Sequence, residues 1–271
     1  EPDSSTWFPL SLFLNRSSDS KLDDVVLFNF DHSSNAAEAY RQLRTNIQFA
    51  LRDSGKSQVV AVTSSSPQEG KTLTSVNLAI TFAQMGKQVL LVEADMRRSK
   101  LASIFKIDRK PGLSDLIIGS ATDSQAIRTV TDIIVGGTEW EKLMNFQGID
   151  NLSLIPAGTL PPNPAELVGA AEFRQLIDHF RQQYEFIIID TPPVLPVTDA
   201  TIISGIVDGT ILVYESDKTS RHLLMRAHQN LTQHNARILG IIINKLAFDV
   251  TLPYYRRQYG YSPGYTSDES D

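Results

Sequence analysis

The chain of 271 residues contains no cysteine, so disulfides, thiolate metal sites and iron–sulfur clusters are excluded. No apolar run reaches the roughly 18 residues needed to span a bilayer, and the apolar-rich stretch 7–14 contains Pro9. A basic excess is also missing, because the formal net charge is -6, which argues against a nucleic-acid partner. Hydrophobic residues make up 41% of the chain, enough for a substantial core. Since the sequence begins with Glu1 rather than Met, we allow for a membrane segment upstream.

Three regions of different character follow one another. Residues 1–33, dense in Ser, Asp and Asn, are predicted to be a linker or membrane-proximal segment. Residues 34–250 form the predicted domain, and residues 251–271 are a polar, tyrosine-rich tail. Helix starts are marked by Asn35 with Glu38, and by Asn163-Pro164 with Glu166.

Within the predicted domain, short apolar runs alternate with helix-like runs. Nearly continuous Val- and Ile-rich runs are typical of strands buried on both faces of a parallel sheet. The expected strands are 59–63, 88–93, 152–156, 186–190, 210–214 and 238–244, and the expected helices are 35–53, 73–85, 164–184, 199–206 and 221–234. The pattern predicts an α/β fold with a doubly wound, mostly parallel sheet and a ligand at the carboxyl ends of its strands.

The run SSSPQEGKT at 64–72 lies between an expected strand and an expected helix, as a phosphate-binding loop does. Backbone N–H groups of such a loop cradle phosphate oxygens, Lys71 reaches the β- and γ-phosphates, and the Thr72 hydroxyl ligates Mg²⁺. The full motif G-x-x-x-x-G-K-[ST] has glycine where this chain has Ser65. The alternative is a glycine turn with a surface lysine. The residues expected to contact nucleotide are Ser66, Pro67, Gln68, Glu69, Gly70, Lys71, Thr72 and Leu73.

Two expected strands end in carboxylates, in VLLVEADMRRS and FIIID. An acid leaving a buried strand is costly unless it meets a cation, and Mg²⁺ prefers oxygen ligands. We therefore expect Asp95 and Asp190 to share a metal site with Thr72, although Asp190 could also be a turn residue. Glu93 could contact the metal through water, accept a proton, or be a buried carboxylate paired with an arginine.

Taken together, these motifs resemble the bacterial tyrosine kinases, P-loop kinases that accompany capsular and exopolysaccharide export. The resemblance spans about residues 25–265. Its segments are EAYRQLRTN at 38–46, SSSPQEGKT at 64–72, EADMR at 93–97, LPPNPAEL at 160–167, DTPP at 190–193 and the tyrosine tail. Two departures stand out: Glu93 replaces the usual Asp, and Gln68 replaces the common Gly, although a non-Gly residue resists positive φ.

The resemblance implies a P-loop NTPase fold with deviant Walker motifs, and ATP with Mg²⁺. It further implies transfer of phosphate to tyrosine by Lys71, Glu93, Asp95, Arg97 and Asp190, with Glu93 orienting or deprotonating the hydroxyl and Arg97 stabilising charge or fixing the acids. The implied acceptors are tail residues of a neighbouring subunit; a docking tail or an RNA-stacking segment is the alternative. These acceptors are Tyr254, Tyr255, Tyr259, Tyr261 and Tyr265.

Glu38, Arg41 and Arg44 are spaced by three, which places them on one side of a helix. On the local pattern alone, a capping glutamate with two solvated arginines is the better explanation. The resemblance instead implies contacts of a ring, an octamer in the family. It also implies a membrane-spanning adaptor or upstream transmembrane region, a tyrosine phosphatase, no nucleic acid, and a place at the cytoplasmic side of the bacterial inner membrane.

Two further residues and two rival functions remain open. Asn244 could border the adenine or simply end its strand, and Asp199 could cap a helix or contact the site. One rival is a regulatory ATPase that partitions DNA or positions division machinery, but such proteins usually carry a lysine where this chain has Ser66. The other is a module that uses ATP only to assemble. Phosphotyrosine formation separates all three.

Overall fold

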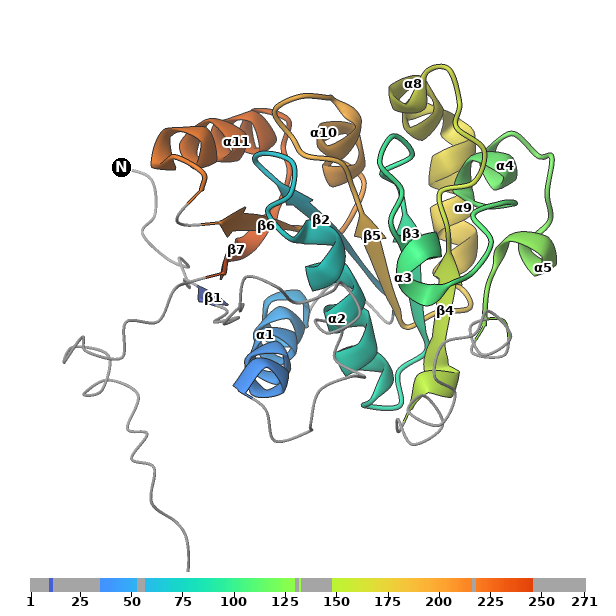
Figure 1. The fold of residues 1–271 in the computed structure, drawn as a ribbon, viewed down its shortest axis with the longest axis horizontal. Coiled ribbons are helices and arrows are strands. Elements are labelled where there is room, and N and C mark those ends of the chain that lie inside the picture. Colours follow the sequence, from blue (N-terminus) through green and yellow to red (C-terminus); the bar gives the residue numbers. More distant parts are fainter. Residues whose placement is uncertain are drawn as a thin grey trace, which may run out of the picture.

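The computed structural model describes residues 10–11, 35–52, 57–129, 132, 148–215 and 218–245. Within them, seven strands form one sheet in the order β1-β7-β6-β2-β5-β3-β4, and every neighbouring pair is parallel (Figure 1). The strands are β1 (Leu10–Ser11), β2 (Gln58–Ser64), β3 (Val89–Glu93), β4 (Leu152–Ile155), β5 (Phe186–Asp190), β6 (Gly209–Glu215) and β7 (Ile238–Asn244). The predicted α/β class is confirmed, but the predicted linker contributes a short strand, β1, beside β7.

Helices connect the strands. They are α1 (Asn35–Leu51), α2 (Lys71–Ala83), α3 (Leu101–Phe105), α4 (Leu113–Ile117), α5 (Asp123–Ala126), α8 (Pro164–Gly169), α9 (Ala171–Phe180), α10 (Asp199–Ser204) and α11 (Arg221–Gln233), with a 3₁₀ turn at Ile149–Asn151. Among the described residues, no helix combines the length and the apolar character that crossing a membrane requires.

The sheet is buried on both faces because successive side chains of a strand alternate between them. On β2, Val60 and Val62 pack in one core with α1 and α2. Val59 and Ala61 pack in the other core, with residues of α4, α8 and α9. This two-sided burial explains why the strand sequences are apolar throughout.

Two sequence expectations about helices were wrong. The single helix expected at 164–184 is two helices, because Ala170 is extended (φ -69°, ψ 153°) after Gly169 ends α8. Three short helices between β3 and β4 were not anticipated. Helices of four or five residues contain too little sequence for the 3.6-residue period to show.

The strand order places the phosphate-binding loop after β2, the central strand of the sheet. β2 lies between β6 and β5, and its chain leaves the carboxyl edge of the sheet toward α2 (Figure 1). At the opposite end of β2, Asp208 accepts from Val59 N at 2.7 Å and pairs with Arg181 through two bonds of 2.8 and 3.0 Å. A fork of this kind is among the stronger ion pairs and fixes the start of the central strand.

Candidate nucleotide and phosphoryl-transfer site

The 64–72 loop turns into α2 at Gly70. Gly70 has φ 94°, a left-handed conformation that glycine adopts without steric cost, and Lys71 is the first residue of the helix. A Cβ at position 70 would lie 2.0 Å from Nδ2 of Asn244, so no larger residue fits there. The free N–H groups at the start of α2 therefore face the space above the sheet edge, as an anion-binding helix start requires.

Two side chains of the loop itself hold its shape. Glu69 is buried and accepts from Ser66 N at 2.8 Å and from the hydroxyl of Thr219. Burial raises the pKa of Glu69, while the bond from Thr219 acts in the opposite direction. Gln68 has φ 69°, so the replacement of the usual glycine does leave a non-glycine residue in the left-handed region. Such a conformation costs about 1–2 kcal/mol.

The Lys71 ammonium lies between the two predicted metal acids. Its Nζ is 2.8 Å from Asp95 Oδ2, 3.7 Å from Asp190 Oδ1 and 3.3 Å from Thr72 Oγ1. Burial lowers the pKa of Lys71, but the carboxylates of Asp190 and Asp95 outweigh it, so the net direction is upward. The structure thus brings together the lysine, the hydroxyl and both acids that the sequence singled out.

Asp190 is a fully buried acid with unused bonding capacity. Its Oδ1 accepts from Ser75 Oγ at 3.3 Å, and its Oδ2 has no hydrogen-bond partner. Burial raises the pKa of Asp190 to about 6, against the pull of Lys71. A buried carboxylate oxygen without a partner, beside a second acid and a hydroxyl, suits a hard cation that takes its remaining ligands from phosphate and water. Within the described ranges there is no cluster of three or more His, Cys, Asp or Glu side chains able to hold a metal ion alone.

Glu93 faces Asp190 in the register of β3 and β5, yet its carboxylate is fully engaged. It is buried and accepts four hydrogen bonds. The donors are Ser99 Oγ at 2.8 Å, Leu101 N at 3.0 Å, Ala157 N at 3.1 Å and Lys100 N. The side chain thus ties the end of β3 to the start of α3 and to the segment after β4. No arginine pairs with Glu93 among the contacts of the described residues, so that alternative fails.

Arg97 lies in the loop after β3 and pairs with a residue of the segment after β5. Its Nη2 is 3.2 Å from Oδ1 of Asp199, whose side chain is buried and whose Oδ2 has no partner. The expected capping role of Asp199 was wrong, because Thr198 occupies the cap position and Asp199 is the first residue of α10. Asp199 instead pairs with Arg97, whose own role in the site stays a prediction.

Asn244 packs against the phosphate-binding loop from the end of β7. Its Nδ2 donates to Glu69 O at 3.0 Å, and its Oδ1 accepts from Lys245 N at 2.9 Å. Lys245 also reaches Gln68 O at 3.2 Å and Glu215 Oε2 at 2.8 Å. Asn244 therefore stabilises the conformation of the phosphate-binding loop. Its contact with adenine stays a prediction.

The expected ring residues lie on α1, away from this site. Arg41 Nε is 2.9 Å from Glu38 Oε2, and both side chains are partly exposed. Arg44 instead donates to Thr81 O at 2.8 Å, which holds α1 on α2. A groove of about 530 Å³ opens along α1, and these three residues line it with Gln42, Thr45 and Asn46. All five predicted acceptor tyrosines lie outside the described residues.

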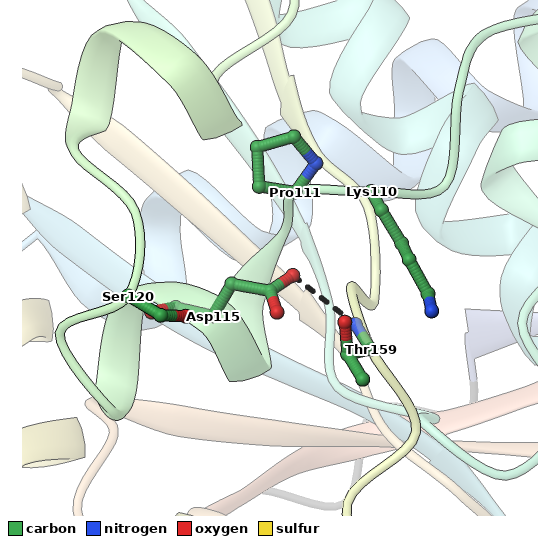
Figure 2. Close-up of a pocket in the computed structure, with 5 residues that line it drawn as sticks. All are labelled: Lys110, Pro111, Asp115, Ser120 and Thr159. Atoms are coloured by element: carbon green, nitrogen blue, oxygen red, sulfur yellow. Dashed lines mark hydrogen bonds between the residues drawn. The ribbon is translucent and has the colours of Figure 1, made fainter.

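A second pocket, of about 260 Å³, contains none of the predicted site residues. Lys110, Pro111, Asp115, Ser120 and Thr159 line it (Figure 2). The Asp115 carboxylate accepts from Gly112 N at 2.9 Å and Thr159 N at 3.1 Å, so it caps α4. This pocket therefore reflects local loop geometry.

Three site residues were missed by sequence reasoning. Ser75 follows Lys71 by four positions, so its helical spacing could have revealed it. Ser99 and Thr219 give no such signal, because Ser99 bonds Glu93 within an irregular loop and Thr219 bonds Glu69 across 150 positions.

Comparison with known proteins places this geometry among characterised folds. The family model described as "AAA domain" matches residues 57–222. The tyrosine-protein kinase YwqD of Bacillus subtilis is 32% identical over 244 residues, covering 89% of this chain and 95% of that protein. The kinase domain of the Escherichia coli tyrosine kinase ETK superposes with a TM-score of 0.75 at 26% identity, covering 96% of this chain and 95% of that one. The septum site-determining protein MinD of Pyrococcus horikoshii, at 22% identity, TM-score 0.54 and coverage of 69% of this chain and 70% of its own, shares the fold alone.

Proposed function

Because this chain belongs to the bacterial tyrosine kinases, we propose that it transfers the γ-phosphoryl group of ATP to tyrosines of its own C-terminal tail. The observation that carries the proposal is the position of Lys71 between Asp95 and Asp190 at the mouth of the phosphate-binding loop. Phosphoryl transfer depends mainly on positioning and charge stabilisation, which such a cluster supplies.

The residues of the site divide the work. Loop amides and Lys71 hold the phosphates, and Lys71 exchanges its bond to Asp95 for phosphate oxygens. Thr72, Asp95 and Asp190 would hold Mg²⁺, which neutralises developing charge on the phosphates. Arg97, anchored on Asp199, stabilises the same charge. Asn244 would border the adenine while supporting the loop.

In the reaction, the tyrosine oxygen forms a bond to the γ-phosphorus as the bond to the bridging oxygen breaks and ADP leaves. The phenol has a pKa near 10, so its proton needs an acceptor. The resemblance to the family assigns this role to Glu93, but its carboxylate is held by four hydrogen bonds, and we expect it to anchor the loop. Its carboxylate can accept the proton only after the hydrogen bond from Ser99 breaks, because both of its oxygens are already occupied as acceptors.

Of the three tyrosines in the described fold, Tyr184 is half-buried and packs edge-on against Phe180, and the other two are poor acceptors. Tyr40 is fully buried, and burial raises its pKa to about 12. Tyr214 is partly buried and donates its hydroxyl hydrogen to Thr219 O at 2.8 Å. Five of the eight tyrosines lie in 254–265, beyond the last strand.

The test is incubation of phosphatase-treated protein with ATP and Mg²⁺, read by intact mass and peptide mapping, beside Lys71→Met. Gains of one to five phosphates on 254–265, absent from Lys71→Met, support the kinase. ADP release without phosphotyrosine would refute the kinase proposal and favour the regulatory ATPase. Nucleotide-dependent assembly without turnover would point to the assembly module.

The ring contact is a separate proposal. Glu38 and Arg41 are partly exposed in the groove on α1, and we propose that their ion pair reorganises toward a neighbouring subunit. Light scattering should give a smaller particle for Glu38→Ala with Arg41→Ala. An unchanged size would remove the idea. Arg44→Ala is a weaker probe, because it also loosens α1 from α2.

The membrane-spanning adaptor or upstream transmembrane region, the tyrosine phosphatase and the position at the cytoplasmic side of the inner membrane remain proposals that rest on the family. Co-purification from membranes with and without the tail tests the adaptor. Loss of phosphotyrosine from the purified protein on addition of a tyrosine phosphatase tests the phosphatase.

A further inference from the structure

A strong local charge asymmetry marks the last part of the domain. Between Lys218 and Lys245 the sequence contains five Lys or Arg residues and no Asp or Glu, although the chain as a whole carries -6. The asymmetry is concentrated at the start of α11, where Lys218, Arg221 and Arg226 are all exposed. His222 and Met225 lie exposed between them. We call the exposed side chains 218, 221, 222, 225 and 226 the basic face.

The two arginines of the basic face have no ion-pair partner among the described residues. Lys218 donates to Gln68 Oε1 at 3.1 Å, so the basic face adjoins the phosphate-binding loop. Arg221 and Arg226 are five positions apart, roughly 7–8 Å along the helix axis and about 140° around it, with His222 and Met225 in the arc between them. Exposed guanidinium groups bind oxygen-rich anions such as phosphate monoesters through paired hydrogen bonds.

The C-terminal tail starts beside this face. β6 and β7 are parallel neighbours in which Glu215 pairs with Asn244 in register. β6 leads through Thr219, whose N–H donates to Glu215 O at 3.0 Å, into α11. β7 ends at the same edge, where Lys245 bonds Glu215 at 2.8 Å. β7 therefore ends beside the carboxyl end of β6, the strand from which the chain continues into α11.

The tail is long enough to reach the basic face. Tyr254 lies nine residues after Lys245 and Tyr265 lies twenty after it. A flexible chain of those lengths spans roughly 16–25 Å. α11 has 13 residues and is therefore about 20 Å long. A short tether of this kind gives a local concentration of about millimolar, so weak affinity suffices for docking.

Charge complementarity selects the phosphorylated tail. Unmodified, residues 251–271 carry Arg256 and Arg257 against Asp268, Glu269 and Asp271, a formal charge of only -1. Each phosphotyrosine adds about -1.5 to -2 and three strong acceptor oxygens. We propose that the basic face of α11 is a docking site for the tyrosine-phosphorylated tail of the same chain, which withdraws the product tail from the transfer site. The proposal rests on the proposed function for the source of the phosphates.

A synthetic peptide separates the two proposals, since its binding needs no kinase activity. Fluorescence anisotropy would follow a labelled 250–271 peptide, unmodified or with five phosphotyrosines, added to full-length Lys71→Met. We expect the phosphopeptide to bind at least tenfold more tightly than the unmodified peptide. Arg221→Ala with Arg226→Ala should weaken phosphopeptide binding about tenfold or more, and Arg174→Ala, an exposed arginine on α9, should not. Added ATP should not displace the phosphopeptide.

Three results would overturn the inference. They are equal affinity for both peptides, binding that the double arginine variant leaves intact, and displacement by ATP, which would place the peptide in the transfer site. Vesicles rich in phosphatidylglycerol serve as a further arm. If they bind through Arg221 and Arg226 while the phosphopeptide does not, the occupant is a membrane surface and the tail proposal is wrong. Absence of phosphotyrosine in the kinase assay would refute the proposed function and leave the peptide result unaffected.

Discussion

Replacing Glu93 by Gln decides whether this residue anchors a loop or accepts the tyrosine proton. The carboxylate accepts four hydrogen bonds while fully buried, two of them at Oε2, from Ser99 Oγ and Ala157 N. The amide nitrogen of glutamine donates and cannot accept a hydrogen bond. Whichever way the amide of Glu93→Gln is turned, its nitrogen therefore faces at least one backbone N–H group. A lost hydrogen bond to a charged group is worth about 1.5–3 kcal/mol, and a stranded buried donor adds a similar cost. We therefore expect destabilisation of about 2–4 kcal/mol.

The assay is urea unfolding of the Glu93 variants beside their autophosphorylation kinetics. Glu93→Asp is the matched comparison, because it keeps the charge and restores the residue usual in the family but is one methylene shorter. If Glu93 anchors the loop, Glu93→Asp should also be destabilised, by about 1–3 kcal/mol, since it cannot reach both Leu101 N and Ala157 N. In the folded fraction, Glu93→Gln should keep turnover within about tenfold of the parent.

The opposite pattern would refute this reasoning. A Glu93→Gln protein as stable as the parent, with turnover reduced by about 10²–10⁴, would identify a general base, because that is the usual contribution of such a group. In that case the hydrogen bond from Ser99 breaks during the reaction. Ser99→Ala should then speed phosphoryl transfer.

Three other predictions concern the phosphate-binding loop and the residues that contact it. Gln68→Gly should raise the unfolding free energy in urea by up to about 1 kcal/mol, because relief of the left-handed conformation exceeds the added unfolded-state entropy, whereas Gln68→Val should lower it. Asp190 has a pKa raised from 3.8 to about 6, so its stabilising contribution is present below pH 4 and lost as pH rises to about 6. Asp190→Asn should accordingly flatten that part of the stability-versus-pH curve by about 3 kcal/mol, and an unaltered curve would count against the shift. Thr219→Val should weaken nucleotide binding several-fold by calorimetry, Thr219→Ser should restore it, and either change should have no effect when Glu69 is already Ala.

The sequence was most informative where a structural element is encoded by contiguous residues. Apolar strands buried on both faces and the loop into α2 are written in contiguous residues, so the parallel sheet and the grouping of Lys71, Thr72, Asp95 and Asp190 could be predicted. Asp190 ends β5 and Asp95 follows the end of β3 by two residues, and parallel strands bring their ends to one edge.

The sequence was least informative where a side chain bonds to residues far along the chain. Ala157 donates to Glu93 across 64 positions, and Thr219 reaches Glu69 across 150 positions. No periodicity encodes such pairs. For the same reason, the pairing of Arg97 with Asp199 could be stated only as one option among others.

The contact between Asn244 and the loop has a consequence for synthesis of the chain. Asn244 donates to the carbonyl of Glu69, a residue made 175 positions earlier. At ribosomal rates of about 5–20 residues per second, the phosphate-binding loop waits roughly 10–35 s for this support. A nascent chain therefore carries its nucleotide loop unsupported until β7 has emerged and joined β6. We therefore expect the loop to reach its nucleotide-binding conformation only after β7 has joined the sheet.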